Sequence, residues 1–371
     1  MSSTSRAVLG WISTIGVFVA VLSYILVTAT APTLIAATQL GNDLSSFSGQ
    51  PPLGAFFIYA RLPVIAVSIN LLAVTYFCIL VFGACFVAAF RSRGGFLLSL
   101  KRLTKVGRIT SSSNWLVAMP LVSSALLIVV VLVTELLSVA GVPSGTLCNP
   151  KINPCPTPAQ LFAGLAYAPI GEELAFRIIT PLGLVIPLRV LWRRLVTRQG
   201  PSKSKFLSLV GLSLLSPERA KAKTGYPTFT LNGWRGVHWL EWIFIAVSSI
   251  SFGLAHVEPG GGTNWGQGKV VTAGISGIAL AIVFVAYGAY AAVLLHWFFD
   301  FYFEVLALGF PVSGSGSLFA LLVNVISLGG LLVIGTLSIT VGIIWFAKRI
   351  RDRVGPTAYK IPEPGTLPVQ A

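Results

Sequence analysis

The feature that most constrains this chain is a series of long apolar segments. A helical run of about 20 apolar residues spans the hydrocarbon core of a bilayer. Eight such runs occur, at roughly 8–30, 63–90, 115–140, 159–187, 239–257, 269–287, 290–308 and 318–346. The short alternating segments of a membrane barrel are absent from the sequence. The sequence therefore predicts an all-α polytopic membrane protein with about eight transmembrane helices.

Composition supports this class. The chain is 55% hydrophobic and only 10% charged, whereas about a quarter of the residues of a soluble domain are charged. A disordered chain would have the opposite bias. Both classes are therefore excluded.

The distribution of basic residues predicts the orientation in the membrane. Lys and Arg number 26 against 11 acidic residues, and most of them lie in 91–113, in 188–238 and after residue 347. The intervening loops are nearly free of them, so the positive-inside rule places both termini in the cytosol. Basic loops also attract anionic lipid headgroups. No aromatic-interleaved basic fold accompanies the charge, so a nucleic-acid partner is not expected.

The four cysteines have two different settings. Cys78 and Cys85 lie inside the second predicted span, where they are expected to pack as small apolar residues. Cys148 and Cys155 bracket a loop that the charge pattern places outside. An oxidising exterior would allow a disulfide between them.

Ionisable residues inside the spans are few, and each is a candidate for function because a charge at mid-bilayer costs roughly 2.5–3.5 kcal/mol. Apart from Glu135 near one end of the third span and Glu241 at the edge of the fifth, they form three short motifs on three different spans. The residues are Glu172, Glu173 and Arg177; His256, with Phe252 four residues earlier; and His296, Asp300 and Glu304.

Helix geometry groups these residues further. Residues four apart share a helix face, so Glu173 and Arg177 are expected to pair. Glu172 is rotated by about 100° from Glu173, so the two acids cannot both face Arg177. His296 and Asp300 are expected to form a single stripe with Glu304. One acid is therefore predicted to be neutralised by Arg177 and the other to be free.

An acid, two histidines and a second acid on separate helices suit the activation of water. Glu172 can accept a proton from water, and histidines can donate hydrogen bonds to a developing oxyanion. A structural polar network that locks the bundle is the alternative. A zinc site is a further alternative, with His256, His296 and Asp300 as ligands and Glu172 as base. No HExxH motif is present, and Arg177 would place positive charge nearby, so no cofactor is the preferred expectation.

At these residues the sequence resembles the CAAX-prenyl-protease and bacteriocin-processing family of intramembrane proteases, which includes the type II CAAX prenyl endopeptidase. The family pattern is EExxxR, FxxxH and HxxxN or HxxxD, and it falls here at Glu172–Arg177, Phe252–His256 and His296–Asp300. A Gly-x-x-Gly run at Gly274 and Gly277 is also similar. The resemblance covers roughly 155–308.

The resemblance implies an eight-span helical fold with a water-accessible chamber in the membrane. It implies peptide-bond hydrolysis by water that a glutamate activates, without a covalent intermediate. Glu172 would be the general base, assisted by His256, and His296 with Asp300 would form the oxyanion hole. Glu173 and Arg177 would orient Glu172 and support substrate binding. Phe252 would pack beneath His256.

One residue departs from the prenyl endopeptidases, which carry Asn at the position of Asp300. Asn donates a hydrogen bond, whereas an ionised Asp only accepts. Asp300 would therefore have to be protonated to stabilise an oxyanion, which burial beside Glu304 would favour. Otherwise it orients His296.

We therefore expect a multi-pass intramembrane endopeptidase in the plasma membrane or an internal membrane. Its expected parts are the helices of 1–154, a protease core at 155–308 and a last helix with a basic tail at 309–371. Prenylated C-termini or other membrane-associated peptides are the expected substrates. The alternatives are a non-catalytic membrane scaffold or immunity protein of the same family, and a proton-coupled transporter.

Overall fold

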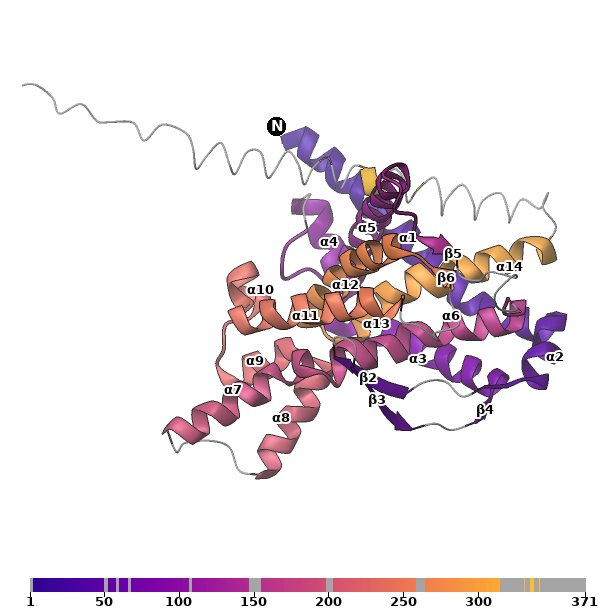
Figure 1. Cartoon of the computed structure of the whole chain (residues 1–371). Helices are drawn as coiled ribbons and strands as arrows, with labels where there is room; N and C mark the ends of the chain where they lie inside the picture. Colours follow the sequence, from indigo (N-terminus) through magenta and orange to yellow (C-terminus); the bar gives the residue numbers. More distant parts are fainter. Residues whose placement is uncertain are drawn as a thin grey trace, which may run out of the picture.

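The structure, a computed structural model, describes residues 3–49, 53–57, 60–65, 68–106, 109–146, 155–197, 203–257, 264–313, 330, 334–336 and 340. Helices dominate this part of the chain (Figure 1). In order they are α1 (Ser3–Ala37), α2 (Gln39–Ser46), α3 (Leu71–Arg91), α4 (Phe96–Val106), α5 (Trp115–Val139), α6 (Pro158–Glu173), α7 (Pro181–Thr197), α8 (Lys203–Leu215), α9 (Pro217–Thr224), α10 (Phe229–Asn232), α11 (Trp239–Ala255), α12 (Gln267–Tyr287), α13 (Ala289–Trp297) and α14 (Phe303–Ser313).

Short turns of other helix types join some of these elements. Two are π-helical, η2 (Leu174–Ile178) between α6 and α7 and η4 (Phe298–Tyr302) between α13 and α14. Two are 3₁₀ turns, η1 (Ser92–Gly94) and η3 (Gly233–Gly236).

Three two-stranded antiparallel sheets accompany the helices in the described part of the chain. They pair β1 (Ser48–Gly49) with β4 (Ile69–Asn70), β2 (Leu53–Phe57) with β3 (Ala60–Ile65), and β5 (Gly145–Thr146) with β6 (Asn264–Trp265).

The predicted helical membrane class is confirmed. Within the described residues, six helical segments are long and apolar enough to cross a bilayer: Gly10–Ala37, Leu71–Gly94, Trp115–Val139, Pro158–Thr197, Gln267–Tyr287 and Ala289–Leu308. A seventh is obtained if Phe229–Gly236 and Trp239–Ala255, which are bent by 75°, form one span. The eighth predicted span, 318–346, lies almost wholly outside the described residues.

The second span begins later than predicted. The prediction had a helix from residue 63, but residues 60–65 form the strand β3, which pairs with β2. Pro63 disfavours helical geometry in the residue before it. Asn70 then caps α3, because its side chain accepts hydrogen bonds from the N–H groups of Leu72 (3.0 Å) and Ala73 (3.4 Å).

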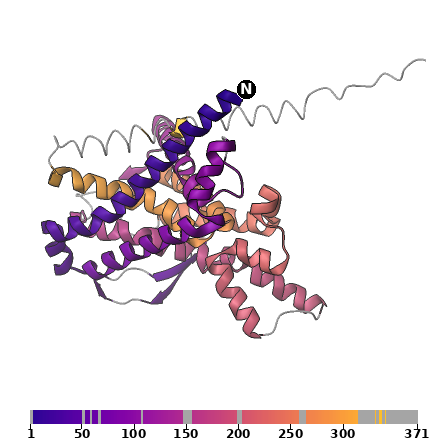
Figure 2. The same ribbon diagram turned by 180° about the vertical axis from the view of Figure 1, so that it is seen from behind.

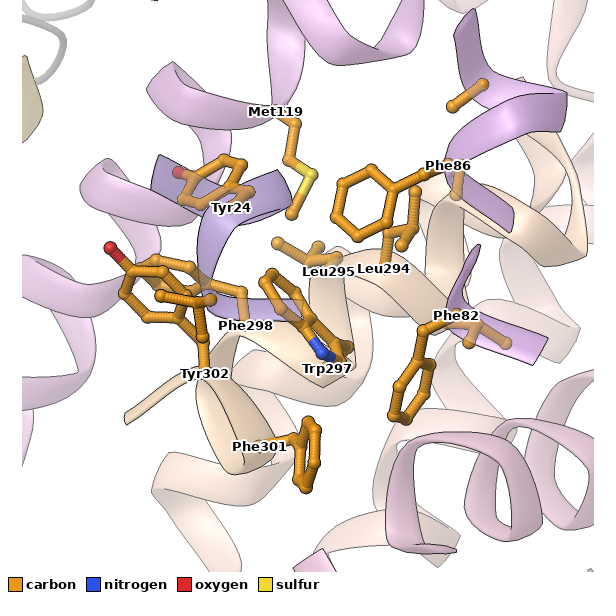
Figure 3. Packing of buried hydrophobic residues seen from close by; sticks show 14 of the residues in the cluster. Tyr24, Phe82, Phe86, Met119, Leu294, Leu295, Trp297, Phe298, Phe301 and Tyr302 are labelled. Atoms are coloured by element: carbon orange, nitrogen blue, oxygen red, sulfur yellow. The ribbon is translucent and has the colours of Figure 1, made fainter. Parts of the chain in front are cut away.

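The core is built around α13. From Ala291 to Trp297 every residue of α13 is buried, so this helix has neighbours on every side. The Trp297 ring packs edge-on against Tyr24 of α1 (6.0 Å between centroids) and Phe86 of α3 (5.3 Å), as Figure 3 shows. Helix α1 runs across one face of the bundle (Figure 2). This packing carries His296, which precedes Trp297, into the middle of the molecule.

Glycines bring α11 and α12 together. A side chain on Gly277 would place its Cβ 3.0 Å from the Cα atom of Ser249 and 3.3 Å from the Phe252 ring. A Cβ on Gly253 would meet the Val270 carbonyl oxygen at 2.5 Å. Small residues let membrane helices approach closely. Gly277, from the predicted Gly-x-x-Gly run, therefore allows α12 to support Phe252.

The described part of the basic segment 188–238, which is 188–197 and 203–238, forms a helical projection at one end of the bundle, made by the end of α7 with α8, α9 and α10 (Figures 1 and 2). Within it, Lys221 of α9 forms a buried ion pair with Glu241 of α11 (2.8 Å). The same Glu241 carboxylate accepts a hydrogen bond from the His238 N–H (2.7 Å) and caps α11. The ion pair therefore connects the projection to α11, which carries the second motif of the candidate site.

Candidate active site

The two adjacent acids lie in the last turn of α6, where the α-helix changes to the π-turn η2. Within η2, the Ile179 N–H bonds the Leu174 carbonyl at 3.2 Å, five residues back. Pro181 follows and has no N–H to continue either helical register. The regular α-helix therefore ends at Glu173, and the next one begins only at Pro181.

Side-chain hydroxyls satisfy the carbonyls at this break. The Thr180 hydroxyl donates to the carbonyls of Phe176 (3.0 Å) and Arg177 (3.2 Å). The Ser248 hydroxyl of α11 donates to the same Phe176 carbonyl at 2.8 Å. Buried carbonyls need such partners, so these hydroxyls stabilise the turn that carries the first motif.

The predicted pair of Glu173 and Arg177 is present and fully buried. The guanidinium donates to Glu173 Oε1 at 2.9 Å, and both side chains are 0% exposed. The same Oε1 atom lies 2.8 Å from His296 Nδ1 on α13. An ionic chain thus runs from Arg177 through Glu173 to His296.

The other nitrogen of His296 faces two further acids. Nε2 lies 3.2 Å from Asp300 Oδ2 and 3.5 Å from Glu172 Oε2. The exposed fraction of the side chain is 34% for Glu172 and 23% for Asp300, against 6% for His296. The imidazole therefore separates a sealed acid on one side from two accessible acids on the other.

Phe252 joins the second motif to the first. Its ring lies below the Arg177 guanidinium at 4.2 Å, a cation–π contact. It also packs edge-on against Phe176 (5.2 Å), His256 (4.9 Å) and His296 (5.7 Å). Phe252 is thus in contact with residues of all three motifs.

His256 ends α11, and its Nδ1 atom lies 2.7 Å from the Phe252 carbonyl oxygen. A carbonyl only accepts, so Nδ1 must carry a proton and Nε2 of the neutral ring keeps a lone pair. The two ring nitrogens of His296 both face carboxylates.

Two of the predicted supporting features are less well defined. Glu304 is half-buried at the start of α14, and the described part of the chain contains no ion pair between it and His296 or Asp300. Asp300 lies within the π-turn η4, which ends just before α14 and Glu304, so the three residues do not follow one regular α-helical stripe. Cys155 is disulfide-bonded, whereas Cys148 lies outside the described residues. Cys78 and Cys85 are free thiols.

The predicted alternative of a three-ligand zinc site needs His256, His296 and Asp300 around one ion. Among the described residues, no group of three or more His, Cys, Asp and Glu side chains is placed to hold a metal ion. In the described part of the chain, His296 Nε2 lies near the carboxylates of Asp300 and Glu172, and Nδ1 lies near Glu173.

Several contributors were not singled out in the sequence. The π-turns at η2 and η4 each interrupt a motif-bearing helix, and such turns are frequent at functional sites. Pro181 was the available indication for η2. Ser248 lies four residues before Phe252 and eight before His256 on one face of α11, so its spacing also pointed toward the site.

Together, apolar helices and a buried acid–histidine centre define a multi-pass membrane protein with an intramembrane polar site. Residues 154–302 match the family model of the type II CAAX prenyl endopeptidase Rce1-like family. This segment contains all three motifs, so the predicted resemblance is confirmed for this part of the chain. The family implies a membrane protease. Comparisons with curated proteins and with solved structures gave no match.

Proposed function

We propose that this chain is an intramembrane endopeptidase that hydrolyses a peptide bond with glutamate-activated water. The observation that carries the proposal is the convergence of two partly exposed carboxylates, Glu172 and Asp300, on one nitrogen of a buried histidine. A purely structural network gains nothing from acids left open to water, whereas hydrolysis needs a base that water can reach.

Glu172 is the proposed general base. It is the most exposed of the site carboxylates, and Arg177 pairs with its neighbour Glu173 rather than with it. Glu172 takes a proton from water as the oxygen attacks the substrate carbonyl. Glu173 and Arg177 hold His296 from the sealed side, so they position the imidazole.

His296 and Asp300 act together on the developing oxyanion. An imidazole between ionised carboxylates carries protons on both nitrogens, and such a ring stabilises negative charge in a water-poor site. The Asp300 contact with His296 at 3.2 Å favours an orienting role for Asp300. Its carboxylate then replaces the amide of the prenyl endopeptidases without having to donate a hydrogen bond itself.

His256 assists from α11. Its Nδ1 atom donates to the Phe252 carbonyl, so Nε2 is the ring atom that can take up a proton. This atom is the proposed acceptor of the second proton of the attacking water, and it transfers that proton to the nitrogen of the leaving amine.

The proposed substrates are membrane-associated peptides, including prenylated C-termini. The proposed orientation has both termini and the basic segments on the cytosolic side, in the plasma membrane or an internal membrane. Arg193 and Arg194 are exposed at the end of α7 beside Trp192, which is 70% exposed. Exposed tryptophan next to arginine suits the headgroup layer of an anionic leaflet.

The test uses the full chain in lipid nanodiscs with fluorogenic peptides, prenylated and unprenylated, and mass spectrometry of the products. We expect cleavage by the unaltered protein and none by Glu172→Ala or His256→Ala. Glu135→Ala, which removes an exposed carboxylate of α5 outside the site, serves as the control. Activity that survives both site substitutions would contradict the mechanism. Activity should also persist in chelator.

A further inference from the structure

Ser248 of α11 connects two motif-bearing helices in a way that the three motifs do not describe. Its hydroxyl is buried and donates to the Phe176 carbonyl, 72 residues earlier in the chain, at 2.8 Å. Phe176 lies in η2, between Glu173 and Arg177 in the chain and five residues before Pro181. The hydrogen bond thus joins α11 to the turn that carries the buried ion pair.

The local sequence explains why this carbonyl needs an external donor. In the π register of η2, each N–H bonds the carbonyl five residues back, as Ile179 bonds Leu174. The donor for Phe176 would then be residue 181, which is proline and has no N–H. Hydroxyl groups of Thr180 and Ser248 take its place.

The consequence reaches the site through Phe252. Ser248 and Phe252 are four residues apart on α11 and so lie on one face of that helix. While Ser248 holds Phe176, the Phe252 ring stays under the Arg177 guanidinium (4.2 Å) and against His296 (5.7 Å). A shift of η2 relative to α11 would move Glu173, and with it the contact to His296 Nδ1.

We propose that Ser248 is a positioning residue: by donating to the Phe176 carbonyl it fixes η2 against α11 and so sets the Glu173–His296 contact. This inference rests on the proposed hydrolytic function of that site. A misplacement of about 1 Å away from the chemistry can reduce a rate by about 100-fold. Ser248 is therefore expected to affect kcat rather than substrate binding.

The helix offers a matched control. Ser249 is the next residue and is equally buried, but its hydroxyl donates to the Ile245 carbonyl of its own helix at 2.6 Å. Ser248→Ala and Ser249→Ala remove the same atom from neighbouring positions. Ser248→Thr keeps a hydroxyl donor at the first position.

The experiment measures kcat and KM on a cleaved peptide, Tm, and hydrogen exchange of the segment 174–180 in nanodiscs. We expect Ser248→Ala to lower kcat by about 10- to 100-fold with KM within twofold, and to speed exchange in 174–180. Tm should stay close to that of Ser249→Ala, whose kcat is unchanged. Ser248→Thr should recover most of the rate.

Equal kinetics and equal exchange for the two alanine variants would overturn the proposal. A loss of kcat in Ser248→Ala that is explained by a lower Tm, with no faster exchange in 174–180, would overturn it as well. Failure of the proposed function has a different result: Glu172→Ala would then cleave normally, or the unaltered protein would cleave nothing. In that case the exchange data still decide, because unchanged exchange in Ser248→Ala contradicts the positioning role by itself.

Discussion

At the scale of single residues, the two nitrogens of His296 divide the site. Nδ1 faces the sealed Glu173–Arg177 pair, and Nε2 faces the accessible acids Glu172 and Asp300. A buried charge that keeps its partner on one side and meets water on the other is costly for stability. Buried ionisable groups with such partners are common at catalytic sites.

The residue that departs from the prenyl endopeptidases gives the first prediction. Asp300→Asn keeps an oxygen that can accept from His296 Nε2, so we expect kcat within about tenfold of the unaltered protein. Asp300→Ala removes the acceptor and should lose about 100-fold, the range for a lost catalytic hydrogen bond. Steady-state kinetics on one peptide checks both. Equal losses in the two variants would show that the orienting contact does not matter.

The sequence could predict the residue pairs that lie within one helix. Spacing alone indicated that Glu173 meets Arg177 and that His296 meets Asp300, and both contacts are present. It could not indicate the Glu173–His296 contact, because these residues are 123 positions apart and only the packing of α6 against α13 joins them.

At the scale of helices and strands, departures from regular geometry form the site. The π-turns η2 and η4 follow Glu173 and Trp297, and a regular helix was assumed at both places. Pro181 accounts for the first turn. For the second, no residue type in Phe298–Tyr302 marks the change, since its aromatic side chains pack with α1 and α3 from elsewhere in the chain.

The close approach of α11 and α12 gives the second prediction. Gly277→Ala places a methyl group 3.0 Å from the Ser249 Cα atom and 3.3 Å from the Phe252 ring. Overpacking of this kind costs about 1–3 kcal/mol, and the displaced Phe252 should also lower kcat. Gly164→Ala in α6 is the control, because a Cβ there meets no atom within 4 Å. Thermal unfolding in detergent and peptide cleavage measure the two effects.

The ion pair between α9 and α11 gives the third prediction. Lys221 and Glu241 are 0% and 1% exposed, and removing one partner of a buried pair costs about 3–5 kcal/mol. Lys221→Met should therefore lower Tm clearly, whereas Lys223→Met, at an exposed position of the same helix, should not. If both substitutions have the same small effect, the pair does not fasten the projection to α11.

At the scale of the whole molecule, the apolar runs predicted the membrane class and located three spans to within a few residues, those at Trp115–Val139, Gln267–Tyr287 and Ala289–Leu308. They placed the start of α3 too early, because a hairpin strand and a helix can both be apolar. Hydropathy also could not predict the bend between Phe229–Gly236 and Trp239–Ala255, because it depends on composition and carries no information on the direction of a helix.

The orientation derived from the basic loops gives the fourth prediction. Helices α2 and α8 lie at opposite ends of the bundle (Figure 1), and Asn42 and Lys205 are exposed on them. In intact cells, an impermeant maleimide should label Asn42→Cys at once and Lys205→Cys only after permeabilisation. Labelling of both variants from one side would contradict the proposed topology.

The most direct test of the central claim is the single-turnover cleavage rate of Glu172→Gln in nanodiscs. The amide keeps the size and the hydrogen-bonding contact of the side chain near His296 but cannot accept the proton of water. General-base catalysis contributes about 10²- to 10⁴-fold, so a loss of that size is expected while Tm is unchanged. A rate within a few-fold of the unaltered protein would show that Glu172 is not the base that activates water.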